Sequence, residues 1–251
     1  MNPRHKYVCL FLIACLLMAT AWGQTTPAPI SSKKPEPVAV PTSNTHTTDD
    51  PDVIRETQLG VSVNGYAGLV WWIPFEFWPY SAEKRGNDPA KMREQLKALK
   101  DYTIVGVFLA KVSALGSFEY ATPSDLQKKV VIRDSDGQEY TALADVTGDA
   151  KTLADLVRPV LANAMGRAGE NFAMLFFPAH TKSGKQIADE TAKGSFAVVL
   201  KDLAGEPETI MLWRTPLTSF SPVRYCPVGK ERVHADWDYC PWHGVKLESK
   251  Q

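Results

Sequence analysis

The apolar segment at the start of the chain places the strongest constraint on the fold, because it decides the compartment in which everything after it folds. Arg4 and Lys6 precede a run of 15 residues, Tyr7 to Ala21, that is apolar apart from one Thr. Basic residues followed by a short apolar run that ends in small residues are typical of a secretory signal, whereas a spanning helix needs about 20 apolar residues. The sequence predicts an exported protein of the periplasm or cell surface, with a signal peptide over residues 1–23.

Two alternatives to simple cleavage stay open. The segment Leu12-Ile13-Ala14-Cys15 resembles a bacterial lipobox, in which the Cys is lipidated and becomes the first residue of the mature chain. Residues 16–18 continue the apolar run, which favours simple cleavage after Ala21 or Gly23 instead. An uncleaved anchor is the second alternative. Membrane contact is therefore expected only through this segment or through a lipid on Cys15.

Residues 24–52 have the composition of a tether. Of these 29 residues six are Pro, six are Thr and three are Ser, and none is aromatic. Such a stretch cannot bury enough apolar surface to offset the entropy lost on ordering the chain. Its prolines favour extended polyproline II, so at ~3.1 Å per residue it spans roughly 90 Å at most. The sequence predicts a disordered spacer here.

The charge balance excludes two classes of partner. The chain has 28 basic and 28 acidic residues. Removal of Arg4 and Lys6 with the signal leaves 26 basic and 28 acidic residues, a net charge of −2. Nucleic-acid binding needs clustered Lys and Arg on one face, and a weakly acidic protein is not attracted to anionic lipid. No nucleic-acid partner is expected.

Residues 53–220 are expected to form one folded body that is mainly β. Asp136-Gly137 separates two β-prone runs, a pattern typical of a hairpin turn. The runs 172–177 and 195–200 are expected to form a second strand pair, joined by a polar loop. The predicted strands are 103–112, 130–133, 138–141, 172–177, 195–200 and 209–214.

Two segments of the body have the pattern of helices. Asp88 can cap a helix that has Pro89 at its first position. A second helix is expected from Thr152 until Gly166, with Pro159 as a kink or restart. Short strands with turn signals and no parallel βαβ alternation favour an antiparallel sandwich.

The order of these features resembles that of bacterial exported immunoglobulin-like domains. The resemblance covers roughly Tyr102 to Leu200 and rests on the long central strand, the hairpin from Val130 to Tyr140, a helical crossover and the segment 169–178. It is a pattern of residue types rather than a catalytic motif. It implies an immunoglobulin-like β-sandwich that serves as a binding or structural module of the envelope.

The segment from Trp71 to Trp78 is the densest aromatic stretch, with five large rings in eight residues. One interpretation is a buried strand that contributes to the core. The functional interpretation is an exposed platform for a sugar, a peptide or another envelope protein. Its binding candidates are Trp71, Trp72, Glu76 and Trp78. Glu76 among rings is also a candidate general acid, although a glycosidase needs a second carboxylate that the sequence does not place.

Residues 221–251 form a tail with two similar segments, Tyr225-Cys226-Pro227-Val228-Gly229 and Tyr239-Cys240-Pro241-Trp242-His243-Gly244. They resemble zinc-ribbon knuckles, each of which offers two ligands three residues apart in that family. The second knuckle keeps both ligands, but the first has Gly229 at the second ligand position. His234 in the intervening loop is the residue that completes a candidate set of Cys226, His234, Cys240 and His243.

The expected compartment favours a competing interpretation of the same tail. Cys9 and Cys15 lie in the signal, so a simply cleaved chain keeps only Cys226 and Cys240. An even pair in an oxidising space predicts a disulfide, worth ~3 kcal/mol for a loop of about fifteen residues. The disulfide is the first prediction, with no cofactor, and zinc is the alternative.

The sequence has no recognised catalytic motif: G-x-S-x-G, P-loop, G-x-G-x-x-G, H-E-x-x-H and EF-hand patterns are all missing. We therefore expect a non-catalytic interaction or structural module of the cell envelope, whose partner is an envelope protein or polysaccharide. The alternatives are an envelope-polymer hydrolase with Glu76 as acid, and a module that binds zinc through its tail.

Overall fold

The computed structural model describes residues 53–146, 148–203 and 205–247. The predicted signal peptide, the tether and the lipidation candidate Cys15 lie outside these residues. Two antiparallel sheets form the body, so the mainly β, antiparallel architecture is confirmed. The five-stranded sheet contains β1 (Gln58–Val63), β2 (Tyr66–Ile73), β3 (Tyr102–Val112), β4 (Phe118–Tyr120) and β7 (Ala173–Pro178). The four-stranded sheet contains β5 (Val130–Arg133), β6 (Glu139–Thr141), β8 (Gly194–Leu203) and β9 (Glu206–Thr215).

The two sheets share one core. Alternate residues of β3, Val105, Val107 and Leu109, point into it from the five-stranded sheet, and Ile132 and Val198 belong to it from the four-stranded sheet. The period of two along a strand explains this alternation. The other face of the five-stranded sheet belongs to a second core.

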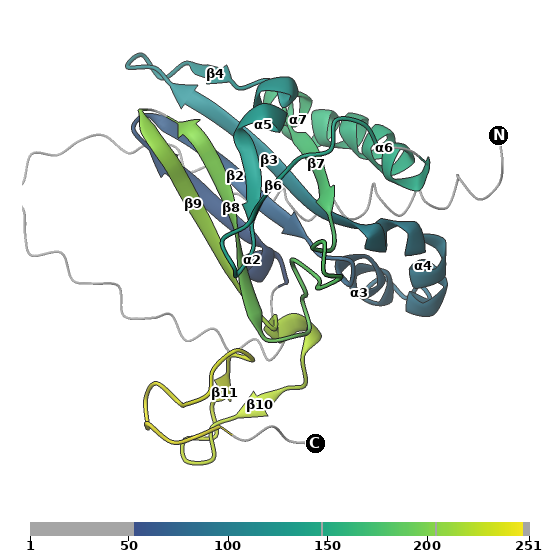
Figure 1. The fold of residues 1–251 in the computed structure, drawn as a ribbon, viewed down its shortest axis with the longest axis vertical. Helices are drawn as coiled ribbons and strands as arrows, with labels where there is room; N and C mark the ends of the chain where they lie inside the picture. The colour runs from purple at the N-terminus through teal and green to yellow at the C-terminus, as the bar shows by residue number, and fades with distance from the viewer. Residues whose placement is uncertain (1–52, 147, 204, 248–251) are drawn as a thin grey trace, which may run out of the picture.

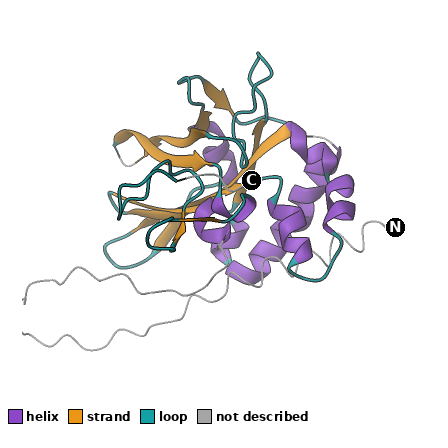
Figure 2. Ribbon diagram, turned by 90° about the horizontal axis from the view of Figure 1, so that it is seen from below, coloured by secondary structure: helices purple, strands orange, loops and turns teal. Residues whose placement is uncertain are grey.

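Helices cover that second face, as Figure 2 shows by grouping the helices on one side of the strands. Ile73, Ile104 and Phe176 face this core from three strands, and Leu99 and Leu153 pack onto it. The molecule therefore has three layers: sheet, sheet and helices. The helical elements are α2 (Val53–Thr57), α3 (Phe77–Glu83), α4 (Pro89–Gln95), η2 (Lys97–Asp101), α5 (Pro123–Lys129), α6 (Gly148–Met165), α7 (Arg167–Glu170) and η3 (Thr218–Phe220).

Several local predictions are confirmed. The Asp136-Gly137 turn joins β5 to β6, with Ile132 paired to Tyr140. The side chain of Asp88 caps α4 by accepting hydrogen bonds from two backbone N–H groups. The second predicted helix is α6, which contains Pro159 and ends directly before Gly166.

One predicted pairing is wrong. We expected 172–177 and 195–200 to pair with each other, but β7 pairs with β3 and β8 pairs with β5 and β9. The two runs are in different sheets. Both have the apolar composition of buried strands, and composition does not tell which neighbour a buried strand has.

The tail lies at one end of the body in Figure 1, where β10 (Arg224–Tyr225) and β11 (Arg232–Val233) form a short ribbon. Its own small core contains Cys226, Val233, Cys240 and Leu247. Ala235 N–H donates a hydrogen bond to Thr218 Oγ1 and thereby joins the tail to the body. No helix within the described ranges is long and apolar enough to cross a membrane.

Candidate metal centre

The two similar segments of the tail fold in the same way. In each, the Cys N–H donates to the carbonyl five residues later, from Cys226 to Glu231 and from Cys240 to Val245. The residue four positions after each Cys returns a hydrogen bond from its N–H to the Cys carbonyl. That residue, Lys230 or Gly244, has a left-handed backbone with φ of 62° and 64°. The sequence echo is therefore a repeated local structure that turns both cysteines inward.

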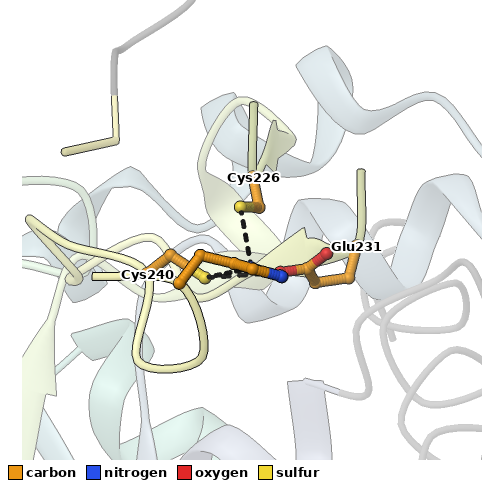
Figure 3. Close-up of side chains that lie close together, drawn as sticks. Cys226, Glu231 and Cys240 are labelled. Atoms are coloured by element: carbon orange, nitrogen blue, oxygen red, sulfur yellow. Dashed lines mark hydrogen bonds and ion pairs between the residues drawn. The ribbon is translucent and has the colours of Figure 1, made fainter. Parts of the chain in front are cut away.

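Four potential ligands converge between the two knuckles. The donor atoms of Cys226, Glu231, Cys240 and His243 all lie within 4.8 Å of one another. Figure 3 shows the side chains of Cys226, Glu231 and Cys240 pointing toward a common point. Both sulfurs lie 3.4 Å from His243 Nδ1, and Glu231 Oε1 lies 3.3 Å from the Cys240 sulfur and 3.1 Å from His243 Nδ1.

Four of the six separations between these donors are close to the edges of a tetrahedron around zinc. Bond lengths of about 2.3 Å to sulfur and about 2.0–2.1 Å to nitrogen and oxygen put a nitrogen or oxygen donor about 3.3–3.6 Å from its neighbours, and the two sulfurs about 3.8 Å apart. The observed contacts of 3.1–3.4 Å fall within a few tenths of an ångström of that range. Two sulfurs, one imidazole nitrogen and one carboxylate oxygen are also the donor types that zinc takes in proteins.

Glu231 completes the group where the sequence pointed to His234. The Glu231 carboxylate lies over Gly229: a Cβ on Gly229 would be 1.9 Å from Glu231 Oε2 and 2.5 Å from His243 Cε1. The absence of a side chain at Gly229 thus leaves room for the Glu231 carboxylate and the His243 imidazole. A carboxylate two residues after the vacant ligand position is the sequence signal for this fourth ligand.

His234 lies outside the group. Its Nδ1 is 2.7 Å from Asp236 Oδ1, and its Nε2 is 3.3 Å from Glu56 Oε1 in the body. The ligand set of Cys226, His234, Cys240 and His243 is therefore corrected at one position. His234 occupies the junction between tail and body instead.

Both cysteines are free thiols in the structure, so the predicted disulfide is not formed there. Burial raises the pKa of the Cys240 thiol, although two backbone N–H groups oppose the shift. The pKa of Glu231 is lowered, chiefly by its own backbone N–H and further by the neighbouring thiols and His243. The carboxylate is therefore ready to bind a cation, whereas a metal must displace the proton of the Cys240 thiol.

The aromatic segment is a core element rather than a platform. Trp72 and Trp78 are 1% and 3% exposed, and Trp71 is partly buried, with its indole N–H donating to Thr57 Oγ1. The strand ends at Ile73 and a helix follows, so the buried strand expected from Trp71 to Trp78 stops early. Burial of Trp72 and Trp78 removes the exposed platform as a binding site.

Glu76 is held by an ion pair. Its carboxylate accepts hydrogen bonds from Nε and Nη2 of Arg93, the shortest at 2.7 Å. A second carboxylate lies close by: Glu190 Oε1 accepts a hydrogen bond from the backbone N–H of Glu76. Both residues line a polar cavity of about 290 Å³. Glu190 is 5% exposed, and burial raises its pKa, with Asp189 and Glu76 adding to the effect. No motif in the sequence points to Glu190.

Comparisons with models of known protein families, with curated proteins and with solved structures each found no match to this chain.

Proposed function

We propose that this chain is an exported cell-envelope protein that acts as a non-catalytic interaction or structural module, and that its tail folds around one zinc ion. The convergence of Cys226, Glu231, Cys240 and His243 carries the metal part of the proposal. The basic and apolar start of the sequence supports export. The immunoglobulin-like type of sandwich belongs to the same proposal, supported by two antiparallel sheets that face each other across one core.

The metal has a structural role in this proposal. The tail core contains four buried residues, and two of them are the cysteines themselves. So small a core does not hold a fold without a disulfide, a metal or a partner. All four donors come from the chain, which is typical of closed structural zinc sites.

Exposed apolar side chains on the tail support the interaction role. Tyr225 and Tyr239 each precede a cysteine, and Val228 and Trp242 each follow one by two residues. All four are exposed, up to 64% for Trp242. The two knuckles thus present the same two positions outward, and exposed aromatic residues of this kind are enriched where proteins bind partners. The proposed partner is an envelope protein or polysaccharide.

Native mass spectrometry of the purified protein, before and after zinc addition, tests the proposal. We expect one zinc ion per chain and two free thiols. Glu231→Ala should weaken zinc binding by more than about 100-fold, because loss of a direct ligand costs more than loss of an outer-shell partner. His234→Ala, which changes the residue favoured by the sequence alone, should retain zinc binding. A metal-free chain with a Cys226–Cys240 disulfide would overturn the metal part. If His234→Ala lost zinc binding and Glu231→Ala retained it, His234 would be the ligand instead of Glu231.

A hydrolase acting on an envelope polymer is the second candidate function. The buried, pKa-raised carboxyl of Glu190 beside Glu76 in the polar cavity favours it. In this version Glu190, rather than the Arg93-bound Glu76, is the general acid. If this candidate is right, the purified protein should release soluble fragments from labelled peptidoglycan. Glu190→Gln should abolish this release, and the surface variant Glu83→Gln should retain it. Failure of the unaltered protein to release fragments would remove this candidate.

A further inference from the structure

A groove between tail and body lies at the open edges of both sheets. It has a volume of about 450 Å³, which is within the range of ligand pockets in proteins. Leu59 of β1 and Leu212 of β9 contribute apolar wall, Glu56 of α2 contributes to one side and Trp237 of the tail to the other. The groove therefore needs body and tail together.

Trp213 links the groove to the core between the sheets. Its ring stacks on Phe196, at 5.6 Å between centroids, and meets Trp72 edge-on inside the sandwich. The same residue lines the groove. Its Nε1 is buried and has no acceptor among the described residues. The groove therefore meets Trp213 as part of a firmly packed wall and not as a hydrogen-bond donor.

The aromatic wall continues onto the exposed face of the tail. Trp237 lies 5.6 Å from Trp242 between ring centroids, and Trp242 is well exposed. Grooves lined by aromatic rings are typical of surfaces that bind proline-rich chains in the polyproline II conformation. Such chains have no internal hydrogen bonds that binding would have to break.

The chain carries a proline-rich segment at the right place. The first described element, α2, begins at Val53, and its Glu56 contacts both His234 of the tail and the N–H groups of Thr218 and Ser219. The described chain thus begins beside the groove. Pro35, Pro37 and Pro41 precede it in the sequence, the last of them 12 residues before Val53.

From these observations we propose that residues 35–41 of the same chain occupy the groove, with their prolines against its apolar and aromatic walls. Twelve residues span at most about 40 Å, which is enough to bring a segment before Val53 to a groove beside α2. Attachment through a short connection gives an effective concentration in the millimolar range, so a weak contact suffices. This inference goes beyond the proposed function and does not depend on export.

Photo-crosslinking tests the inference in the full chain. Val38, between the prolines, is replaced by p-benzoylphenylalanine, and crosslinked peptides are mapped by mass spectrometry. We expect crosslinks within one chain to the peptides that contain residues 212–217 and 234–237. Leu212→Glu should reduce their yield by about tenfold, the factor that corresponds to ~1.4 kcal/mol of binding.

Ile210→Glu is the matched control. Ile210 and Leu212 are both 53% exposed. They lie two residues apart on β9 and therefore share a face of the strand. Of the two, only Leu212 lines the groove. Equal crosslinking in the two variants would overturn the inference, as would crosslinks that join an isotope-labelled chain to an unlabelled one. The zinc content of each variant, measured in parallel, separates a failure of this inference from a failure of the metal centre.

Discussion

Gly229 is the residue on which the geometry of the metal centre depends most closely. A methyl group at this position would meet both the Glu231 carboxylate and the His243 ring. These two side chains cannot move away without leaving the donor positions. We expect Gly229→Ala to lower zinc affinity by about 10-fold to 100-fold, measured by competition with a chromogenic chelator.

The control for this substitution is Gly60→Ala. Gly60 lies in β1, and a Cβ there would have no atom within 4 Å. The control should bind zinc as the unaltered chain does. An equal loss of affinity in both variants would mean that Gly229 acts through general stability instead.

Sequence reasoning identified three of the four residues of this centre, and the physical reason for the missing one is specific. Cys226, Cys240 and His243 stand at the ligand positions of the zinc-ribbon knuckles that the two segments resemble, so the resemblance identified them. Glu231 follows the left-handed residue Lys230, and its direction depends on a backbone conformation that spacing does not encode. His234 had the right chemistry but lies at the tail–body junction.

Glu190 makes a different prediction at the residue scale. Its folded-state pKa is raised, first by burial and then by nearby carboxylates. A carboxyl with a raised pKa stabilises the fold fully below its unfolded pKa of about 4.3, and the contribution is lost as pH rises through the folded pKa. Gln at this position can still accept the hydrogen bond of Glu76 N–H, but it does not ionise.

Glu190→Gln is therefore expected to become more stable than the unaltered chain as pH rises from about 4 to 7. The gain should be about 1.4 kcal/mol for each unit by which the pKa is raised. Urea unfolding at several pH values measures it. If the two proteins showed the same dependence of stability on pH, the pKa of Glu190 would not be raised in the folded state.

At the scale of elements, β3 organises the body. It pairs with β2 along eight residues and with both β4 and β7 on its other edge. Gly106 lies in the middle of this strand, and a Cβ there would be 2.1 Å from Phe172 Cζ. The glycine gives the Phe172 ring its place in the core beneath the helices.

We expect Gly106→Ala to destabilise the protein by about 1–3 kcal/mol, because overpacking a filled core forces side chains off their preferred positions. Chemical denaturation measures the change. The double variant Gly106→Ala with Phe172→Leu should lose less stability than the sum of the single variants, since the two residues contact each other. Additive losses would show that the strain lies elsewhere.

The elements that sequence predicted well are those with local signals. The α4 cap depends on Asp88 and Pro89, and the β5–β6 hairpin on Asp136-Gly137, and both act within a few residues. The hairpin of β1 and β2 was missed although Asn64-Gly65, both with positive φ, is a strong turn signal. The choice of neighbouring strands for β7 and for β8 depends on packing across the whole body, and a local sequence pattern does not contain that information.

At the scale of the whole molecule, the body and the tail differ in what holds them together. The body has two extensive cores, one between the sheets and one beneath the helices. The tail has a small core built around its two cysteines. Its links to the body include the Ala235–Thr218 hydrogen bond and the Lys193–Asp238 ion pair. The proposed zinc ion should therefore determine the stability of the tail and leave the body largely unaffected.

Removal of zinc by a chelator tests this division of the molecule. Structural zinc contributes about 10–16 kcal/mol of binding free energy at neutral pH in small metal-dependent folds, far more than the few contacts between tail and body supply. We expect the backbone amides of Cys226 and Cys240, which donate within the knuckles, to lose protection from hydrogen exchange under reducing conditions. The amides of β3 and β8 should keep theirs, because their hydrogen bonds lie in sheets that border a core without metal ligands. Zinc added back should restore protection. If the tail amides stayed protected without metal, the tail would be held by its packing, and if the sheets lost protection together with the tail, the two parts would form a single cooperative unit.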